Sequence, residues 1–181
     1  EAKRTKGRGR RPILIGILLL PTALDDKTPA MKIAHFFGVA GGLVQIIGLL
    51  RWPFAVSNLA RIYTSAQSSV AEKEAAAVVF QCLHQYGGVV LGEHIGQFFT
   101  ITWMTILCLN WLSTKRFPRW FCLAGLFASV VYILAQGELL ATAIPGFPIF
   151  NEASTYGSML WLLWLIVLGI SLIRHSRGLN E

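Results

Sequence analysis

The sequence predicts an all-α integral membrane protein: a four-transmembrane-helix bundle with a short N-terminal interfacial helix and an outer surface helix. Hydrophobic residues make up 54% of the 181 residues and charged residues only 14%, whereas soluble domains carry about a quarter charged residues. Residues 157–173 contain no charged side chain, and Arg174 and Arg177 follow at once. This pattern is typical of a membrane-crossing helix with a cytoplasmic stop.

The chain is long enough for one helical bundle and no sizeable separate domain, so residues 1–181 form a single membrane domain. Residues 1–11 are a basic arm with six Lys or Arg residues. Beside a membrane such an arm binds anionic lipids, so we expect no nucleic-acid partner. Residues 12–24 begin with only nine apolar residues, too few for a crossing, and predict an interfacial or half-span helix.

Four later segments are long and apolar enough to cross the bilayer, and each is predicted as a transmembrane helix: 33–50, 89–112, 120–140 and 156–173. The turn 115–119 holds three basic residues and the loop 141–155 none. Four crossings place this turn, the basic arm and Arg174 on one side, as the positive-inside rule requires. We therefore expect a multi-pass membrane protein with both termini in the cytoplasm.

Aromatic side chains lie at the predicted membrane boundaries. Trp52 and Tyr156 mark the outer ends of their spans, and Trp111 and Trp120 mark the inner ends. Such positions are typical of an interfacial aromatic belt.

The segment between the first two spans predicts the largest extramembrane element. Pro53 indicates a helix boundary near Trp52. Ser69 and Glu72 have capping-box spacing, which predicts an outer-side amphipathic helix over 69–86. Gly87 and Gly88 are the expected bend, because an unbroken helix from Val70 to Leu112 would be about 64 Å long, about twice the thickness of the membrane core.

Glycines at four-residue spacing predict close helix packing. Gly88, Gly92 and Gly96 share one face of the second span, and Gly38 and Gly42 share a face of the first. Small faces let helix backbones approach closely in lipid. We expect these two helices to pack together, and a homodimer seam is the alternative.

A group of polar and ionisable residues is predicted at one depth near the outer ends of the helices. Such groups are costly in a membrane, so they face the bundle interior and pair with each other. Arg51 is expected to pair with Glu93 or Glu138, because guanidinium matches a carboxylate in two-point geometry. The whole candidate cluster comprises Arg51, His84, Glu93, His94, Gln97, Gln136 and Glu138.

Three interpretations of this cluster remain open. It is a structural hydrogen-bond network, a site for a small polar ligand, lipid headgroup or ion, or a metal site. His84, Glu93, His94 and Glu138 are acceptable ligands for zinc, copper or iron. However, no histidine-box motif is present, and adjacent Glu93 and His94 point about 100° apart on a helix.

The sequence contains no catalytic or cofactor motif that specifies a reaction. No nucleophile elbow of the G-x-S-x-G type occurs. Cys82, Cys108 and Cys122 lack C-x-x-C spacing, and the last two are expected as free buried thiols. The cofactor is therefore unknown, and none is implied.

Two stretches carry a resemblance to a known family. They are RWPF at 51–54 and EAAAVVFQCLHQYGGVVLGEHIGQ at 74–97, in which Gly-Glu-His-x-Gly-Gln at 92–97 is the most specific element. From residue 33 to about residue 173 the chain resembles a family of uncharacterised bacterial membrane proteins, domain of unknown function four-three-eight-six. The resemblance implies a small polytopic bacterial membrane protein, so we expect it in the bacterial cytoplasmic (inner) membrane. It implies no established activity, cofactor or catalytic residue.

The function expected from these observations is non-catalytic. The chain is interpreted as an accessory or scaffold subunit that packs against other membrane protein subunits or against itself. The alternative is a small-molecule, ion or metal-binding protein (a transporter, sensor or metalloenzyme) that uses the outer-leaflet Glu, His and Arg side chains.

Overall fold

The computed structural model describes residues 28–178, without the side chains of 142, 143 and 175–178. Every regular element in this range is helical, which confirms the predicted all-α class. In chain order the elements are α2 (Pro29–Arg51), the π-helical segment η1 (Trp52–Val56), α3 (Ser57–Thr64), α4 (Val70–Leu83), the π-helical segment η2 (His84–Ile95), α5 (Gly96–Thr114), α6 (Arg119–Ala135), α7 (Gly137–Ala143) and α8 (Ala153–Gly178). The predicted basic arm 1–11 and interfacial helix 12–24 lie outside the described residues.

Four helices of the described range are long and apolar enough to cross a membrane, as predicted. They are Pro29–Thr64 with 36 residues, Val70–Thr114 with 45, Arg119–Ala141 with 23 and Ala153–Arg174 with 22. Each predicted span lies inside one of them. The chain is therefore a helical membrane protein with four such helices in the part described.

The first helix continues through Pro53, so the boundary predicted near Trp52 is wrong. Proline cannot supply the N–H that normally bonds the carbonyl four residues earlier. Here the Trp52 N–H bonds to the Leu49 carbonyl instead. The Gly48 carbonyl thereby loses the Trp52 N–H as its donor. It accepts a hydrogen bond of 2.7 Å from Arg51 Nη1 in its place. Because both carbonyls have donors, the chain passes through the π-helical turn η1 into α3.

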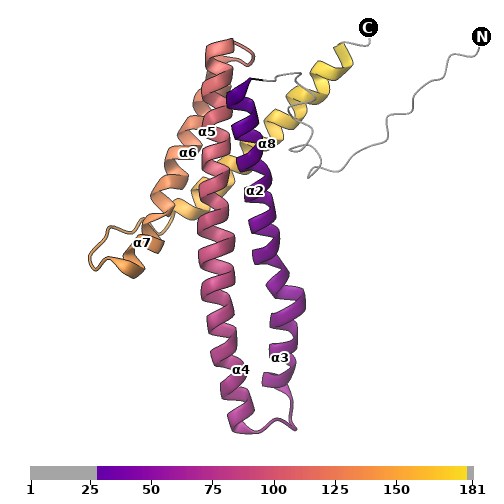
Figure 1. Cartoon of the computed structure of the whole chain (residues 1–181), viewed down its shortest axis with the longest axis vertical. Coiled ribbons are helices and arrows are strands. Elements are labelled where there is room, and N and C mark those ends of the chain that lie inside the picture. Colours follow the sequence, from indigo (N-terminus) through magenta and orange to yellow (C-terminus); the bar gives the residue numbers. More distant parts are fainter. Residues whose placement is uncertain (1–27, 179–181) are drawn as a thin grey trace, which may run out of the picture.

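The second helix continues through Gly87 and Gly88, so the bend predicted there is also wrong. α4, η2 and α5 form one uninterrupted helix of 45 residues, about 68 Å long at 1.5 Å per residue. Figure 1 shows it as a single straight rod beside α2. Gly88 is buried beneath the Arg51 side chain. Packing of this kind offsets the helix-breaking tendency of glycine, so residues 69–86 extend the rod instead of lying across it.

The capping box predicted at Ser69 is confirmed. The Ser69 N–H donates to Glu72 Oε2 over 2.7 Å, and the Glu72 N–H donates to Ser69 Oγ over 3.3 Å. These reciprocal bonds satisfy two backbone donors at the start of α4. They fix the point where the chain turns back after α3.

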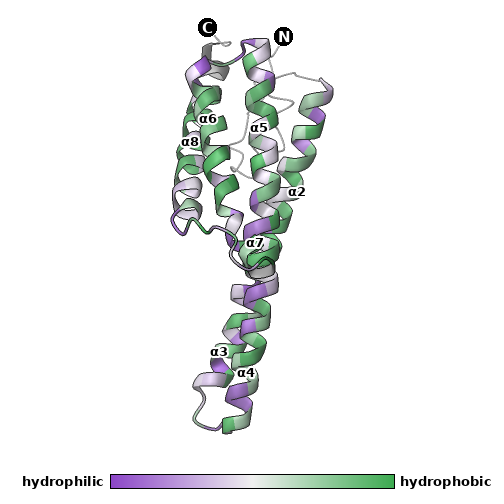
Figure 2. Ribbon diagram, turned by 90° about the vertical axis from the view of Figure 1, so that its left-hand side faces the viewer, coloured by the Kyte–Doolittle hydropathy of each residue, from purple (hydrophilic) through white to green (hydrophobic). Residues whose placement is uncertain are grey.

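The helices pack in the order α2, α5, α6, α8, and Figure 2 shows α5, α6 and α8 rising side by side above the narrower α3–α4 hairpin. Indole and phenyl rings fill the space between α5, α6 and α8. Trp164 Nε1 donates to the Phe121 carbonyl over 3.1 Å, and the two rings stack with centroids 4.9 Å apart. The buried cluster contains Met31, Ala34, Trp103, Met104, Leu107, Cys108, Trp111, Phe121, Cys122, Ala128, Trp164 and Leu168.

Three of the four predicted belt aromatics lie on the surface. Trp52 is 47% exposed, Tyr156 58% and Trp120 63%, whereas Trp111 is fully buried. The Trp111 ring lies 4.4 Å from that of Phe117, so it serves as a core residue and its assignment to the belt is wrong. Helix position alone gives the depth of a side chain along the axis, and packing decides which way it faces.

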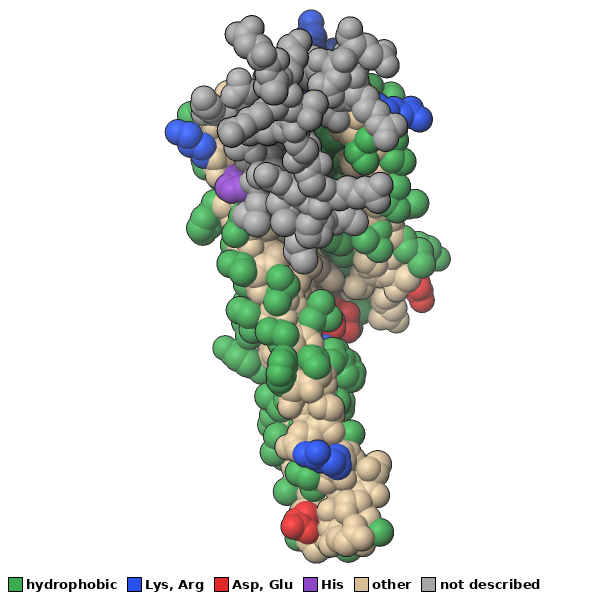
Figure 3. Space-filling model, turned by 90° about the vertical axis from the view of Figure 1, so that its right-hand side faces the viewer, with side chains coloured by type: hydrophobic (Ala, Val, Ile, Leu, Met, Phe, Trp, Pro, Cys, Tyr) green, Lys and Arg blue, Asp and Glu red, His purple; other side chains and the backbone are tan. Residues whose placement is uncertain are grey.

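The outer surface of the bundle is apolar, as a lipid-facing surface must be. Figure 3 shows many hydrophobic side chains along the described part of one face of the molecule. More than half of the surface of each of these side chains is exposed: Phe36, Leu43, Ile47, Phe98, Leu109, Leu123, Phe127, Leu163 and Ile166. In water such a surface would drive aggregation.

The two ends of the bundle differ in their structural elements and in their basic residues. The turn between α5 and α6, the start of α2 and the end of α8 lie together at one end (Figure 1). α7 and the loop to α8 lie toward the other, and the hairpin of α3 and α4 extends far beyond them. The basic residues Arg116, Arg119 and Arg174 are at the first end.

Candidate functional site

The candidate site forms where Arg51, the last residue of α2, lies against η2. Arg51 Nη2 is 4.0 Å from Glu93 Oε1, so of the two expected carboxylate partners the structure selects Glu93. The Arg51 side chain is 11% exposed and that of Glu93 is 54% exposed. Glu138 is exposed at the start of α7 and, among the described residues, makes no ion pair or hydrogen bond.

The predicted glycine face creates the space that Arg51 occupies. A Cβ atom added at Gly88 would lie 2.6 Å from the Arg51 guanidinium carbon, and one added at Gly96 would lie 2.7 Å from Gln45 Cγ. Gly92 faces Gly48 directly. The three glycines thus pack against α2, as predicted.

The glycine face predicted on α2 is only partly correct. Gly38 is buried, but a Cβ at Gly42 would meet no described residue within 4 Å. Gly41 and Gly48 make the close approaches instead. The α2 surface in contact is therefore rotated from the predicted one, because the position of α5 sets which side of α2 is covered.

A second polar group joins the rod to the end of α6. His94, 5% exposed, lies with Nδ1 3.2 Å from Gln136 Oε1. Gln136 Nε2 donates to Gln97 Oε1 over 2.9 Å. Because the Gln136 oxygen faces the imidazole, the tautomer with the proton on Nδ1 completes this hydrogen bond. Three of the predicted residues therefore form one continuous network.

His84 and Glu138 lie outside this network, so the candidate metal ligands are not gathered. His84 stacks on Phe80 with ring centroids 5.7 Å apart, and its buried Nδ1 has no hydrogen-bond partner in the described part of the chain. Among residues 28–178 with described side chains, no three His, Cys, Asp or Glu residues lie close enough to hold a metal ion. Glu93 and His94 diverge on the helix, as expected, and His94 is committed to Gln136.

A cleft of about 200 Å³ opens beside the ion pair. Its walls come from α2, the middle of the rod, α6 and α8, and they combine polar groups with apolar side chains. It is lined by Gln45, Gly48, Leu49, Arg51, Gly92, Glu93, Gln97, Tyr132 and Trp161. This arrangement can hold a small polar group against an apolar wall.

A comparison of the sequence with known protein families identifies one match. Residues 12–169, which include the cleft and the Gly-Glu-His-x-Gly-Gln element, match the family model of DUF4386, a domain of unknown function. The chain belongs to the DUF4386 family. No curated protein and no solved structure matches the chain.

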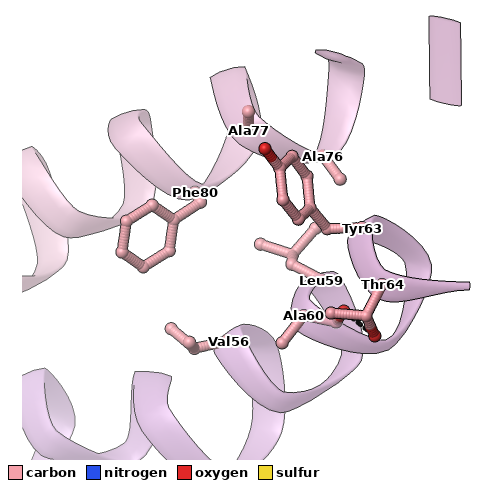
Figure 4. A pocket seen from close by; sticks show the side chains of 8 residues that line it. All are labelled: Val56, Leu59, Ala60, Tyr63, Thr64, Ala76, Ala77 and Phe80. Atoms are coloured by element: carbon pink, nitrogen blue, oxygen red, sulfur yellow. Dashed lines mark hydrogen bonds between the residues drawn. The ribbon is translucent and has the colours of Figure 1, made fainter. Parts of the chain in front are cut away.

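The DUF4386 chain has a second concave surface, in the projecting hairpin. A pocket of about 290 Å³ lies between α3 and α4, with Leu59 and Tyr63 on one side and Ala77 and Phe80 on the other (Figure 4). Its lining is almost wholly apolar. Nothing in the sequence pattern singled out this pocket, because α3 was not predicted.

Sequence reasoning on this DUF4386 protein missed several residues of the cleft. Gln45, whose Nε2 donates to Thr100 Oγ1 over 3.0 Å, lies on the same face of α2 as Gly41 and Gly48. The spacing of four and then three residues is the signal that could have found this face. Tyr132 and Trp161 come from helices whose rotation the sequence pattern leaves open.

Proposed function

We propose that this protein is a non-catalytic accessory subunit of a membrane complex and that its projecting hairpin docks a partner subunit. The observation that carries the proposal is the length of the first two helices, 36 and 45 residues. A crossing needs about 20 residues. Both helices therefore extend well past the bilayer on the same side, to the turn that joins them.

The membrane boundary can be located from the basic end of the rod. Counting about 20 residues back from the α5–α6 turn reaches Glu93, and the residues from 70 to 92 add about 34 Å beyond it. Trp52, exposed at the end of α2, lies at the same level. The hairpin accordingly stands in water.

A two-helix hairpin in water has little core of its own. In the described part of the chain, α3 and α4 pack mainly against each other and their own helical continuations. Apolar side chains of α4 are exposed on the hairpin: Val70 is 73% exposed, Val78 59% and Val79 46%. Helices of this length gain most of their stability from packing, so a partner protein that covers this surface stabilises the hairpin.

The orientation we propose follows from charge. The positive-inside rule puts the turn with Arg116 and Arg119 in the cytoplasm, together with both chain termini. The hairpin then projects to the outer side of a bacterial inner membrane. Its partner is an outer-side domain of another membrane protein.

Photo-crosslinking from Val78 tests the docking role. A photo-reactive amino acid at Val78, in the cells that naturally make the protein, should give one adduct with a single defined protein, heavier than the 20.0 kDa chain. The control position is Leu109, which is equally exposed but lies on the lipid-facing part of α5. It should give no protein adduct.

A second measurement links the adduct to assembly. The Val78→Asp variant, extracted in mild detergent, should migrate at a smaller native size than the unmodified protein, since a charge would disrupt an apolar contact. Unchanged native size in this variant, or an adduct of twice the chain mass, would contradict the accessory role; the latter would assign the hairpin to self-assembly.

A further inference from the structure

Arg51, which lines the cleft, carries hydrogen-bond donors that have no acceptor among the described residues. Its Nη1 donates to the Gly48 carbonyl, but its Nε is buried without a partner in that part of the chain. Glu93, at 4.0 Å from Nη2, is beyond hydrogen-bonding distance. A guanidinium presents five N–H donors and no acceptor, so most of its donors are unused.

Other walls of the cleft add donors of the same kind. Trp161 lines the cleft, and its buried Nε1 has no acceptor among the residues that the structure describes. Gln97 also lines the cleft, and its side-chain oxygen accepts a hydrogen bond from Gln136. The Gln97 amide nitrogen is left as a donor. Three side chains from three different helices therefore offer N–H groups and a positive charge. Such a set matches an oxyanion.

The remaining walls are apolar. Leu49, Tyr132 and Trp161 supply hydrocarbon and aromatic surface next to the donors. At about 200 Å³ the cleft is smaller than a site for a whole drug-sized ligand. It fits a headgroup with the first atoms of an attached chain.

The depth of the cleft agrees with a headgroup. Arg51 lies about 28 Å along α2 from Lys32, which is close to the thickness of a hydrocarbon core. The Arg51 donors thus lie at the level where the headgroups of one leaflet begin. Arg51 also lies over the Trp52 ring at 5.2 Å, a contact suited to this boundary.

We propose that this cleft binds the oxyanion of a phosphate or carboxylate group, supplied by a lipid headgroup or by a free anion. Arg51 binds the charge in two-point geometry, and Gln97 and Trp161 donate to the remaining oxygens. Glu93 competes for Arg51, and its exposed carboxylate is free to turn toward water as the anion enters. The proposal is independent of the docking role of the hairpin.

Binding of two lipids that differ only in a phosphate tests the proposal. The full chain in neutral detergent is titrated with dioleoyl phosphatidic acid, dioleoylglycerol or inorganic phosphate, and bound ligand is counted by native mass spectrometry. Phosphatidic acid should fill one site at least tenfold more tightly than dioleoylglycerol. Competition by inorganic phosphate at similar concentrations would identify a free anion as the ligand, and its failure to compete would identify a lipid.

Matched variants assign the binding to the cleft. Arg51→Gln should weaken phosphatidic acid binding at least tenfold, while Arg61→Gln, the same charge change on an exposed hairpin residue, should change it less than twofold. Trp161→Phe keeps the aromatic ring and removes one donor, so it should weaken binding severalfold. Glu93→Gln should strengthen it, because the competing carboxylate is gone.

The proposal is overturned if the two lipids bind equally, or if Trp161→Phe and Arg51→Gln both bind like the unmodified chain. It is also overturned if Glu93→Gln abolishes binding while helicity is retained, since Arg51 would then serve the ion pair alone. Should Arg51→Gln not fold, Trp161→Phe and Glu93→Gln decide the outcome.

Discussion

At the scale of single residues, the contact between Gly48 and Gly92 determines how closely α2 approaches the rod. A Cβ atom added at Gly48 would lie 2.7 Å from Gly92 Cα and 3.0 Å from the Gly87 carbonyl oxygen. Both neighbours are backbone atoms, which cannot turn aside as a side chain can. The position of Arg51, one turn further along α2, depends on this approach.

We expect Gly48→Ala to destabilise the protein by about 1–3 kcal/mol, the usual cost of overpacking a filled interior. The control is Gly42→Ala, whose Cβ would meet nothing within 4 Å; it should be neutral or stabilising by up to about 1 kcal/mol, since alanine favours helix over glycine. Both are measured by denaturant unfolding in detergent. Equal stability of the two variants would mean that the helices do not pack at Gly48.

The glycines of the two helices show which parts of the site could be predicted from the sequence and which could not. Gly88, Gly92 and Gly96 were correctly placed against the first helix because a four-residue repeat defines a face by itself. Gly42 was wrongly included, since the side of α2 that is covered depends on the partner helix. Arg51 pairs with Glu93 and not with Glu138, a choice that depends on helix rotation and so could not be predicted from the sequence.

At the scale of elements, the end points of the helices are set by local hydrogen bonds. Ser69 and Glu72 start α4 through the reciprocal capping bonds, and the sequence was sufficient to predict this because all partners lie within four residues. The continuations at Pro53 and at Gly87–Gly88 could not be predicted. They depend on Arg51, which satisfies the Gly48 carbonyl and covers Gly88.

Removal of the cap should loosen the first turn of α4. In Ser69→Ala the Glu72 N–H loses its acceptor, so amide hydrogen exchange over residues 70–74 should become severalfold faster. The control is Ser68→Ala, a neighbouring serine that makes no hydrogen bond to α4 in the described structure. If amide exchange in Ser69→Ala is unchanged, the connection between α3 and α4, and not the Ser69 cap, keeps the first turn of α4 in place.

At the scale of the whole molecule, the described residues form four helices that are long and apolar enough to cross a membrane. The class and the number of long helices were predictable because length and apolarity are properties of the sequence alone. The tall hairpin was not, since it depends on two helices continuing where local signals predicted breaks.

Thiol labelling tests on which side of the membrane the hairpin and the α5–α6 turn lie. Cys82 is exposed on α4, whereas Cys108 and Cys122 are buried. A membrane-impermeant maleimide applied to intact spheroplasts should therefore label Cys82. In a Cys82→Ser background, Lys115→Cys should react only after the membrane is permeabilised. Reaction of Lys115→Cys in intact spheroplasts would reverse the proposed orientation.

The unbroken rod from Val70 to Thr114 has a mechanical consequence. Glycine backbones that touch at Gly48 and Gly92 prevent sliding, because a shift of one residue would bring a side chain against a backbone. The contact instead acts as a fulcrum. A sideways force on the hairpin tip would tilt the rod as a lever and move the end at Thr114 in the opposite direction. Motion at one end of the rod would therefore reach the other end without any helix unwinding.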